Sequence, residues 1–412
     1  MQNFPHKTIV IFGAGKIGRS FIGQLFSRGG YEVVFIDVFK PVIEALNKRR
    51  NYDVIIKSAS DEIIQVTHVR GVLADDLHAV ASEVASAGIV AVSVGLHGLK
   101  GIFPALAKGL IERYIINSRL PLDIIIAENM RDADAYFRAE LSKFLPSDYP
   151  FKQLVGLVET SIGKMVPIML KKDVEEDILQ VFAEPYNTLI LDKKAFKNPI
   201  PPVEGLAPKE NMKAWVDRKL FIHNLGHATA AYMGYLHNPG LVFLYEALAV
   251  QSVYDVVRNT MLQSAAILLK KYPDEFTPAD LTAHIDDLLF RFRNKALGDT
   301  LFRVGCDLMR KLGPEDRLAG AIKTAISLGL PYDKLLYALV CGIHFRATDE
   351  NGNMLPDDVE FAKLYEKGVS HILITVCNFN QNQYRRLFEE ARTIDTCLHS
   401  IKSKGKLGMQ SL

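Results

Sequence analysis

The feature that most constrains the fold is a glycine-rich turn between an apolar run and a helix-forming stretch. The segment "IVIFGAGKIGRSFIG" places Gly13, Gly15 and Gly18 in the spacing GxGxxG directly after an apolar run. The next β-branched run, "YEVVFIDV", carries Asp37 near its end. A strand, this glycine spacing, a helix and an acidic residue after the second strand together indicate a dinucleotide-binding βαβ unit.

Each part of this turn has a physical role in binding a dinucleotide. Gly13 allows the tight turn, Gly15 lets the pyrophosphate approach the backbone, and Gly18 permits close helix packing. The start of the helix presents free N–H groups to the phosphates. Asp37 would accept hydrogen bonds from both ribose hydroxyls and repel a 2′-phosphate, so NAD is expected rather than NADP. The predicted cofactor-binding residues are Gly13, Ala14, Gly15, Lys16, Ile17, Gly18 and Asp37.

The order of elements divides the chain into two domains. A chain of 412 residues is too long for one ordinary core. The first half alternates β-branched runs with helical stretches, which is typical of a mostly parallel α/β sheet. After the proline-rich "KNPIPPVEGLAP" the period becomes helical. The sequence therefore predicts an α/β plus all-α protein, with a Rossmann-like dinucleotide-binding domain over residues 1–200 and a mainly helical C-terminal domain over residues 201–412. We expect strands within 7–15, 31–38, 52–58, 63–69, 89–95 and 123–129, and long helices over 211–236, 241–271 and 278–293.

Composition excludes several classes of partner. The 49 basic and 47 acidic residues leave a net charge of +2 without a long basic stripe, so nucleic acid is not expected to bind. The longest apolar run, around Leu335 to Ile343, is too short to cross a membrane. We expect a cytoplasmic protein that is a monomer or a dimer. The four cysteines are too widely spaced for a CxxC pair and are interpreted as small buried residues in helices: Cys306, Cys341, Cys377 and Cys397.

The segment "RKLFIHNLGHATA" places polar groups of proton chemistry on one side of a predicted helix. At about 100° per residue, Lys219, His223, Asn224 and His227 fall within an arc of roughly 140°. An ordinary amphipathic helix with its polar side toward water would show the same pattern. Beside a dinucleotide, however, these groups suit the oxidation of a secondary alcohol, which needs a base for the hydroxyl proton and donors for the negative charge on oxygen. The lysine can be that base only if its pKa is depressed, as burial would do.

The order Lys-x4-Asn-x2-His after a Rossmann domain resembles the polyol-specific long-chain dehydrogenases, also called the mannitol dehydrogenase family. The resemblance covers nearly the whole chain, through "GAGKIGRSFIG", "AENM", "EPYNTLILDKKAF", "EGLAP", "RKLFIHNLGHA" and "RKLGPEDRL". It implies that Lys219 is the general acid/base, that Asn224 and Asn129 hold the substrate oxygen, and that His227 orients the substrate and the lysine. It also implies catalysis without a metal. Some members carry a glutamate where this chain has Val216, so a proton relay through that position is not carried over.

In its length, the chain is more similar to members of the branch of this family that acts on a hexitol phosphate than to the other branches, which are usually longer. The expected reaction is the interconversion of mannitol 1-phosphate and fructose 6-phosphate. Three cations surround the break "LGPED" between two predicted helices, where they could bind a phosphate together with free N–H groups. The helix dipole alone would also favour cations there. The predicted phosphate-binding residues are Arg310, Lys311 and Arg317.

Four other functions fit parts of the pattern. A hexuronate reductase acting on fructuronate or tagaturonate, or a free-polyol 2-dehydrogenase, would use the same lysine. A zinc enzyme is suggested by His223 and His227, which are four residues apart, but "HNLGH" lacks the glutamate of HExxH and offers no third ligand. We therefore expect no metal site. A nucleotide-binding protein without turnover is the remaining alternative, and the complete Lys, Asn and His set argues against it.

Overall fold

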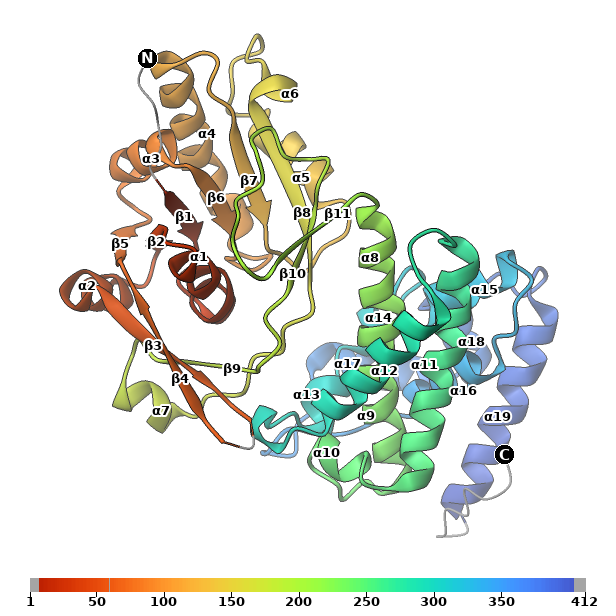
Figure 1. The fold of residues 1–412 in the computed structure, drawn as a ribbon. Coiled ribbons are helices and arrows are strands. Elements are labelled where there is room, and N and C mark those ends of the chain that lie inside the picture. The colour runs from red at the N-terminus through yellow and green to blue at the C-terminus, as the bar shows by residue number, and fades with distance from the viewer. Residues whose placement is uncertain (1–6, 59, 404–412) are drawn as a thin grey trace. The chain divides into compact units, whose positions relative to one another are not determined.

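Eight strands form the main sheet of the N-terminal unit in the computed structural model, which describes residues 7–58 and 60–403 (Figure 1). Their order is β11-β10-β8-β7-β6-β1-β2-β5. The six strands from β8 to β5 pair in parallel, and β10 is antiparallel to β8. The predicted parallel α/β sheet is confirmed. The strands are β1 Thr8–Phe12, β2 Glu32–Asp37, β5 Val69–Leu73, β6 Ile89–Val92, β7 Leu122–Ile126, β8 Val155–Ile162, β10 Leu189–Asp192 and β11 Leu206–Lys209.

Helices cover both faces of this sheet, because the central strands β1, β6 and β7 are buried at every position except Thr8. Alternate residues of a strand point to opposite faces, so Ile9 and Ile11 of β1 belong to one buried cluster and Val10 and Phe12 to the other. Phe21 packs in the first cluster. The helices and turns of the N-terminal unit are η1 Gly18–Gly23, α1 Gln24–Arg28, α2 Lys40–Arg49, α3 Leu77–Ser86, α4 Leu99–Ile116, α5 Ala133–Leu141, α6 Phe151–Leu154 and α7 Lys171–Glu176.

Two of the predicted strands form a separate small sheet. β3 Asn51–Ile56 and β4 Glu62–Thr67 pair antiparallel, and β9 Val181–Ala183 runs parallel to β3. The expectation that both strands belong to the mostly parallel sheet is thus wrong. The reason lies in the burial pattern: only alternate residues of β3 are buried, namely Tyr52, Val54 and Ile56. Such alternation is typical of a strand with one covered face.

The C-terminal unit is helical and is organised around one buried helix. The predicted long helix over 211–236 consists of α8 Met212–Arg218, the π-helical turn η2 Lys219–Asn224 and α9 Leu225–His237. α9 packs against α10, α11, α13 and α16, and its small residues permit this close approach. A Cβ at Gly234, for example, would overlap Ala247. The other helices are α10 Leu244–Ala247, α11 Gln251–Lys271, α12 Pro278–Phe292, η3 Lys295–Leu297, α13 Leu301–Gly305, α14 Leu308–Lys311, α15 Ala319–Ser327, α16 Asp333–Ile343, α17 Pro356–Tyr365, α18 Val369–Thr375 and α19 Arg385–Ser403.

Helix starts explain one agreement with the expected boundaries and one difference. The helix predicted over 278–293 begins at Pro278 because Thr277 and Asp280 form a reciprocal capping box. The segment 241–271, expected as one helix, contains two helices, α10 and α11. Glu246 accepts hydrogen bonds from the backbone of Val242 and Phe243, which fixes the start of the short α10.

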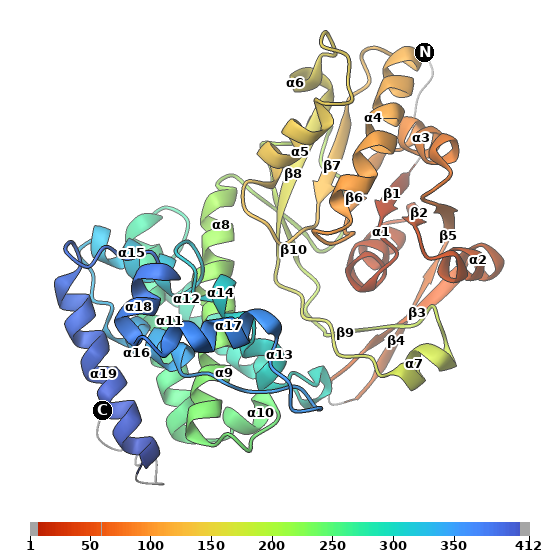
Figure 2. The same ribbon diagram turned by 180° about the vertical axis from the view of Figure 1, so that it is seen from behind.

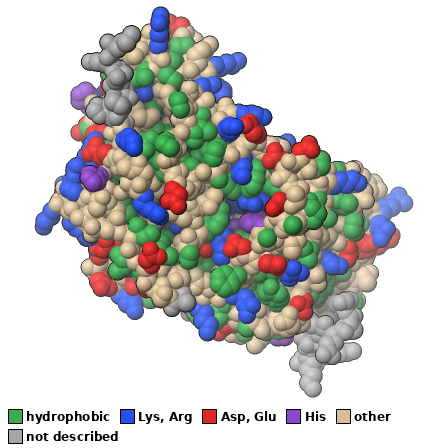
Figure 3. All heavy atoms as spheres, in the orientation of Figure 1, with side chains coloured by type: hydrophobic (Ala, Val, Ile, Leu, Met, Phe, Trp, Pro, Cys, Tyr) green, Lys and Arg blue, Asp and Glu red, His purple; other side chains and the backbone are tan. Residues whose placement is uncertain are grey.

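The N-terminal unit extends beyond the predicted boundary at residue 200. The structure divides into Met1–Val216 and Asp217–Leu412. β11 pairs with β10 and so adds the segment after residue 200 to the sheet. Of the cysteines, Cys341 and Cys377 are buried, whereas Cys306 and Cys397 are partly exposed. Cys306 follows α13 and Cys377 follows α18, so the prediction that all four lie within helices is wrong for these two. Basic and acidic side chains intermingle on the face shown in Figure 3. Among the helices of the described residues, none is long and apolar enough to span a membrane.

Candidate active site

The glycine-rich turn has the geometry that its predicted roles require. Gly13 has a φ of +100°, and a Cβ there would overlap the carbonyl oxygen of Ser93. A Cβ at Gly18 would overlap the carbonyl oxygen of Gly13, so the helix approaches the turn closely. A Cβ at Gly15 would meet no atom within 4 Å. The two buried glycines therefore close the turn, and the exposed one leaves its backbone accessible to a ligand.

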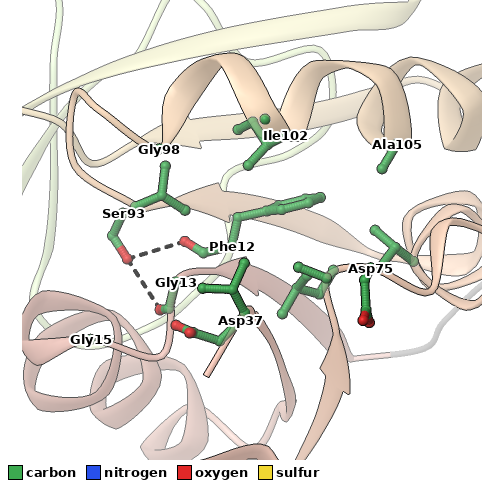
Figure 4. Close-up of a pocket in the computed structure, with 15 residues that line it drawn as sticks. Phe12, Gly13, Gly15, Asp37, Asp75, Ser93, Gly98, Ile102 and Ala105 are labelled. Carbon is green, nitrogen blue, oxygen red and sulfur yellow. Dashed lines mark hydrogen bonds between the residues drawn. The ribbon is translucent and has the colours of Figure 1, made fainter. Parts of the chain in front are cut away.

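A cavity of about 390 Å³ opens beside this turn (Figure 4). Its lining includes Gly13, Gly15, Asp37 and the apolar side chains of Val80 and Ile102. It lies at the carboxyl ends of β1, β2 and β6, and the strand order reverses between β1 and β6. Such a switch point is where open α/β sheets bind ligands.

The carboxylate of Asp37 is held in place at this cavity. It accepts hydrogen bonds from the backbone N–H of Ala14 at 2.7 Å and of Phe39 at 2.9 Å. A carboxylate has about four acceptor positions, so these two bonds leave capacity for ribose hydroxyls. The sequence predicted that Asp37 binds the ribose of the cofactor, and its side chain lies in the wall of this cavity.

Arg19 stabilises the glycine-rich turn from its buried side, and this residue was not predicted from the sequence. Its side chain is buried, with Nε donating to the carbonyl oxygen of Ala14 at 2.7 Å and Nη1 to that of Leu179 at 2.6 Å. Burial lowers the pKa of this guanidinium. The predicted neighbours Lys16 and Ile17 are exposed and half-buried, respectively, at the start of the helix. The signal available in the sequence was an arginine directly after Gly18.

The π-helical turn η2 brings Lys219 and Asn224 to one side of the helix. In an α-helix, residues five apart are separated by about 140° of arc. In a π-helix the backbone hydrogen bonds join residues i and i+5, so such residues lie one turn apart on nearly the same side. The prediction of a regular α-helix over this segment was therefore wrong. The angle around the helix axis between Lys219 and Asn224 is smaller in the π-helical turn than it would be in an α-helix.

The environment of Lys219 suits a base. Its side chain is largely buried, and this burial, together with the charge of Arg317, lowers the pKa of Lys219 to about 8. Arg317 is buried; its Nη1 donates to the carbonyl oxygen of Asn224 at 3.2 Å and its Nε to Asp316 at 2.8 Å. Arg317 thus fixes the end of the π-helical turn and disfavours the charged form of the lysine.

Asn224 offers a side-chain amide to a ligand. Within the part of the chain that the structure describes, this amide makes no hydrogen bond, while the backbone carbonyl accepts from Arg317. The residue is partly exposed and follows directly after the buried His223. An amide N–H₂ in this position can donate to a substrate oxygen without breaking a bond within the protein.

His227 is oriented by a carboxylate that the sequence interpretation missed. Its Nε2 lies 3.0 Å from Oδ2 of Asp299, and its ring stacks on Phe292 with centroids 4.6 Å apart. Asp299 is buried and also pairs with Arg303. Asp299 lies far from His227 in the sequence, so no local pattern identified it.

The zinc alternative gains no support from this geometry. The rings of His223 and His227 are 6.2 Å apart, and the pKa of His223 lies well below its ordinary value, mainly because of burial and the nearby Arg291. Over residues 7–58 and 60–403, the group of three possible metal ligands that come together does not include either histidine.

The remaining predicted residues lie in different surroundings. Asn129 follows β7 in the N-terminal unit, so its partnership with Asn224 stays a prediction. Arg310 is exposed and pairs with Asp307 and Asp316. Lys311 is buried, with its Nζ donating to the carbonyl oxygen of Val304 at 2.8 Å; burial and Arg317 lower its pKa to about 8.

Dehydrogenases that use a nucleotide cofactor bind it in a cavity at the edge of a parallel sheet. They also need a base for the substrate proton, and a lysine of lowered pKa in the same helix as an asparagine and a carboxylate-bound histidine suits that task. The chain belongs to the mannitol dehydrogenase family: the family's Rossmann domain matches residues 7–205 and its C-terminal domain matches residues 211–382. It is accordingly an oxidoreductase of the polyol dehydrogenase family.

Two solved structures share this fold over nearly their whole length. Mannitol 2-dehydrogenase of Pseudomonas fluorescens, in a ternary complex with NAD and D-mannitol, is 17% identical with a TM-score of 0.73, over 97% of this chain and 92% of that one. A D-sorbitol dehydrogenase in substrate-free form is 16% identical with a TM-score of 0.80, over 96% and 93%. Both similarities confirm the predicted fold class of a Rossmann-like domain followed by a helical domain.

Proposed function

We propose that this chain is a mannitol-1-phosphate 5-dehydrogenase, which interconverts mannitol 1-phosphate and fructose 6-phosphate with NAD. The observation that carries the dehydrogenase chemistry is the lowered pKa of Lys219, about 8, on the same side of the helix as Asn224. The preference for a phosphorylated substrate rests on Arg310, Lys311 and Arg317, three cations on and after α14.

Each side chain has one task in this reaction. The neutral amine of Lys219 takes the proton of the substrate hydroxyl during oxidation and returns it during reduction. The amide of Asn224 donates to the substrate oxygen as its charge develops, and Asn129 is the second proposed donor. His227, held by Asp299, orients the hydroxyl toward the lysine. When bound, NAD supplies the hydride acceptor.

The glycine-rich turn and Asp37 hold the dinucleotide in this proposal. Backbone N–H groups at Gly15, Lys16 and Ile17 bind the pyrophosphate, and the open space at Gly15 allows it to approach. Asp37 binds the ribose hydroxyls and repels the 2′-phosphate of NADP. The Pseudomonas fluorescens relative was solved with NAD, which supports the same cofactor here.

Asp37→Ser removes most of the discrimination against NADP. Loss of a hydrogen bond to a charged group costs about 1.5–3 kcal/mol, so we expect the ratio of kcat/KM for NADH over NADPH to fall by about 10- to 100-fold. Steady-state rates with both cofactors measure this ratio. Asp75→Ser is the matched control, because Asp75 lines another part of the same cavity. A native preference for NADPH would contradict the assignment.

Arg310→Ala raises the KM for fructose 6-phosphate by about tenfold and changes the KM for fructose much less, because one charge-assisted bond to phosphate is lost. Arg310 suits this test better than Arg317, which also contacts Asn224. Arg386→Ala, an exposed arginine of α19 that pairs with Glu390, is the control. Equal effects on both sugars would remove the phosphate role from Arg310.

A second candidate is an enzyme for an unphosphorylated substrate. It is favoured by the contacts of the proposed phosphate ligands, since Arg310 pairs with two aspartates and Lys311 is buried against a carbonyl. The Pseudomonas fluorescens relative was solved with D-mannitol, a free polyol. Comparing NADH oxidation with fructose 6-phosphate, fructose, fructuronate and tagaturonate decides between these substrates. The highest kcat/KM with fructose 6-phosphate supports the proposal, and a preference for any other substrate overturns it.

A further inference from the structure

Three helices of the C-terminal unit, α16, α17 and α19 (labelled in Figure 2), lie next to a cluster of four polar side chains. His344 follows α16, Tyr365 ends α17, and Asp395 and His399 lie one turn apart on α19. The Nε2 of His344 is 2.7 Å from Oδ1 of Asp395, and the Nε2 of His399 is 3.9 Å from that same oxygen. None of these residues belongs to the dehydrogenase site proposed above.

The hydroxyl of Tyr365 lies between the other three groups. It is 2.6 Å from Oδ1 of Asp395, 2.8 Å from Nε2 of His399 and 3.1 Å from Nε2 of His344. A phenol has one hydrogen to donate, so it serves only one of these three neighbours as a donor. The four atoms therefore form a compact group in which nitrogen and oxygen lone pairs converge.

The dimensions of this group are close to those of a tetrahedral metal site. The ligand atoms of His344, Asp395 and His399 all lie within 4.8 Å of one another. Zinc bonds of about 2.0–2.2 Å place tetrahedral ligands roughly 3.3 Å apart. The 2.7 Å and 3.9 Å separations bracket this value, so each needs to change by well under 1 Å.

Burial and charge favour a bound cation with access from solvent. The side chain of His344 is 1% exposed and that of Asp395 17%, which limits competition from water, whereas His399 is 59% exposed and provides an entry path. A positive charge that would repel the ion is Arg346, whose guanidinium lies 5.4 Å from the centre of the Tyr365 ring. Arg346 is held there by the carbonyl oxygens of Ile343 and Phe345.

We propose that His344, Asp395 and His399 bind a divalent transition metal ion, preferentially Zn²⁺, with the Tyr365 hydroxyl as fourth ligand. Two imidazoles exclude Mg²⁺ and Ca²⁺, which prefer oxygen ligands alone. The ion joins α19 to α16 and α17. It has a structural role, because the proposed proton transfer is carried by Lys219.

The metal site also connects to the core around the catalytic helix. Phe345, next to His344, packs edge-on against Tyr232 and Tyr235 of α9, with ring centroids 5.3 Å and 5.1 Å apart. Metal binding therefore stabilises the packing behind α9 without contacting Lys219. We expect its effect to appear in the melting temperature rather than in turnover.

The test uses Zn²⁺ titration by calorimetry and Co²⁺ absorption on the full chain after chelator treatment. The native protein is expected to bind one equivalent, to give the visible spectrum of tetrahedral Co²⁺ and to melt at a higher temperature with Zn²⁺. His399→Gln weakens binding by at least the 10- to 100-fold that loss of an outer-shell partner costs, and Asp395→Asn has the same direction of effect. His399 is exposed, so its replacement tests binding without disturbing the core.

His78→Gln is the matched control, since His78 is an exposed histidine of the N-terminal unit. It is expected to leave the affinity, the Co²⁺ spectrum and the melting shift unchanged. Chelation is expected to leave turnover of the native enzyme at 25 °C unchanged. Native protein that binds no stoichiometric Zn²⁺, or His399→Gln protein that binds as tightly as native, would overturn the site.

Discussion

Lys219→Ala is expected to lower turnover by about 10²- to 10⁴-fold, the contribution of general acid–base catalysis. The affinity for NADH is expected to stay close to native, because the glycine-rich turn and Asp37 belong to the other unit. A change in turnover without a change in cofactor binding separates loss of the proton acceptor from loss of the fold. Stopped-flow turnover and fluorescence titration with NADH measure the two quantities.

The pH profile tests the same residue independently. The pKa of Lys219 is lowered to about 8, so its amine becomes neutral as the pH rises through that value. Oxidation needs the neutral amine, and kcat/KM for the polyol is expected to rise through pH 8; reduction needs the ammonium, and its kcat/KM is expected to fall over the same range. In Lys219→Ala, both the rise of kcat/KM for oxidation and its fall for reduction near pH 8 are expected to disappear.

Lys213→Ala is the control for this prediction, because Lys213 is an exposed lysine of α8 in the same continuous helix. It is expected to keep native turnover and the native pH profile. Added methylamine is expected to restore part of the activity of Lys219→Ala by replacing the missing base. Near-native turnover in Lys219→Ala would remove the lysine from the mechanism.

Asn224→Ala is expected to lower kcat by about 10²- to 10³-fold, as loss of an oxyanion donor does. The amide has no hydrogen-bond partner within the described residues, so its removal breaks no internal hydrogen bond and stability is expected to change little. The step of the pH profile near 8 is expected to persist, since Lys219 remains. This combination distinguishes a lost oxyanion donor from a lost base.

Asn382→Ala replaces an exposed asparagine before α19 and is expected to leave kcat unchanged. Melting temperatures of both variants show whether the helix is intact. If Asn224→Ala lost activity together with a large drop in melting temperature, the asparagine would be a structural residue of the turn rather than a donor to substrate.

The dinucleotide half of the site was predictable because its chemistry is local. Gly13, Gly15 and Gly18 lie within one turn, and the strand that ends in Asp37 is the next one along the chain. Backbone conformation and strand order together determine that these residues meet. The six strands expected in the first half lie where they were predicted, although the separate pairing of β3 with β4 was not predicted.

The other half of the site depends on contacts that no local pattern encodes. Asp299, which contacts His227, lies in the loop between η3 and α13. Arg317, which contacts Asn224, lies in the segment before α15. The π-helical turn was missed for a related reason: the apolar period of the segment fits an α-helix nearly as well, and only packing selects the wider turn. The group around Tyr365 likewise joins residues from three helices.

The wider turn from Lys219 to Asn224 places stability and activity in opposition. Its six residues are flanked by ordinary α-helix on both sides, and a regular helix has better hydrogen-bond geometry. A variant selected only for heat resistance would gain by making this segment regular, and Asn224 would then turn away from Lys219 by about 140° of arc. Substitutions meant to raise the thermal stability of the enzyme should therefore be made outside the segment Lys219–Asn224.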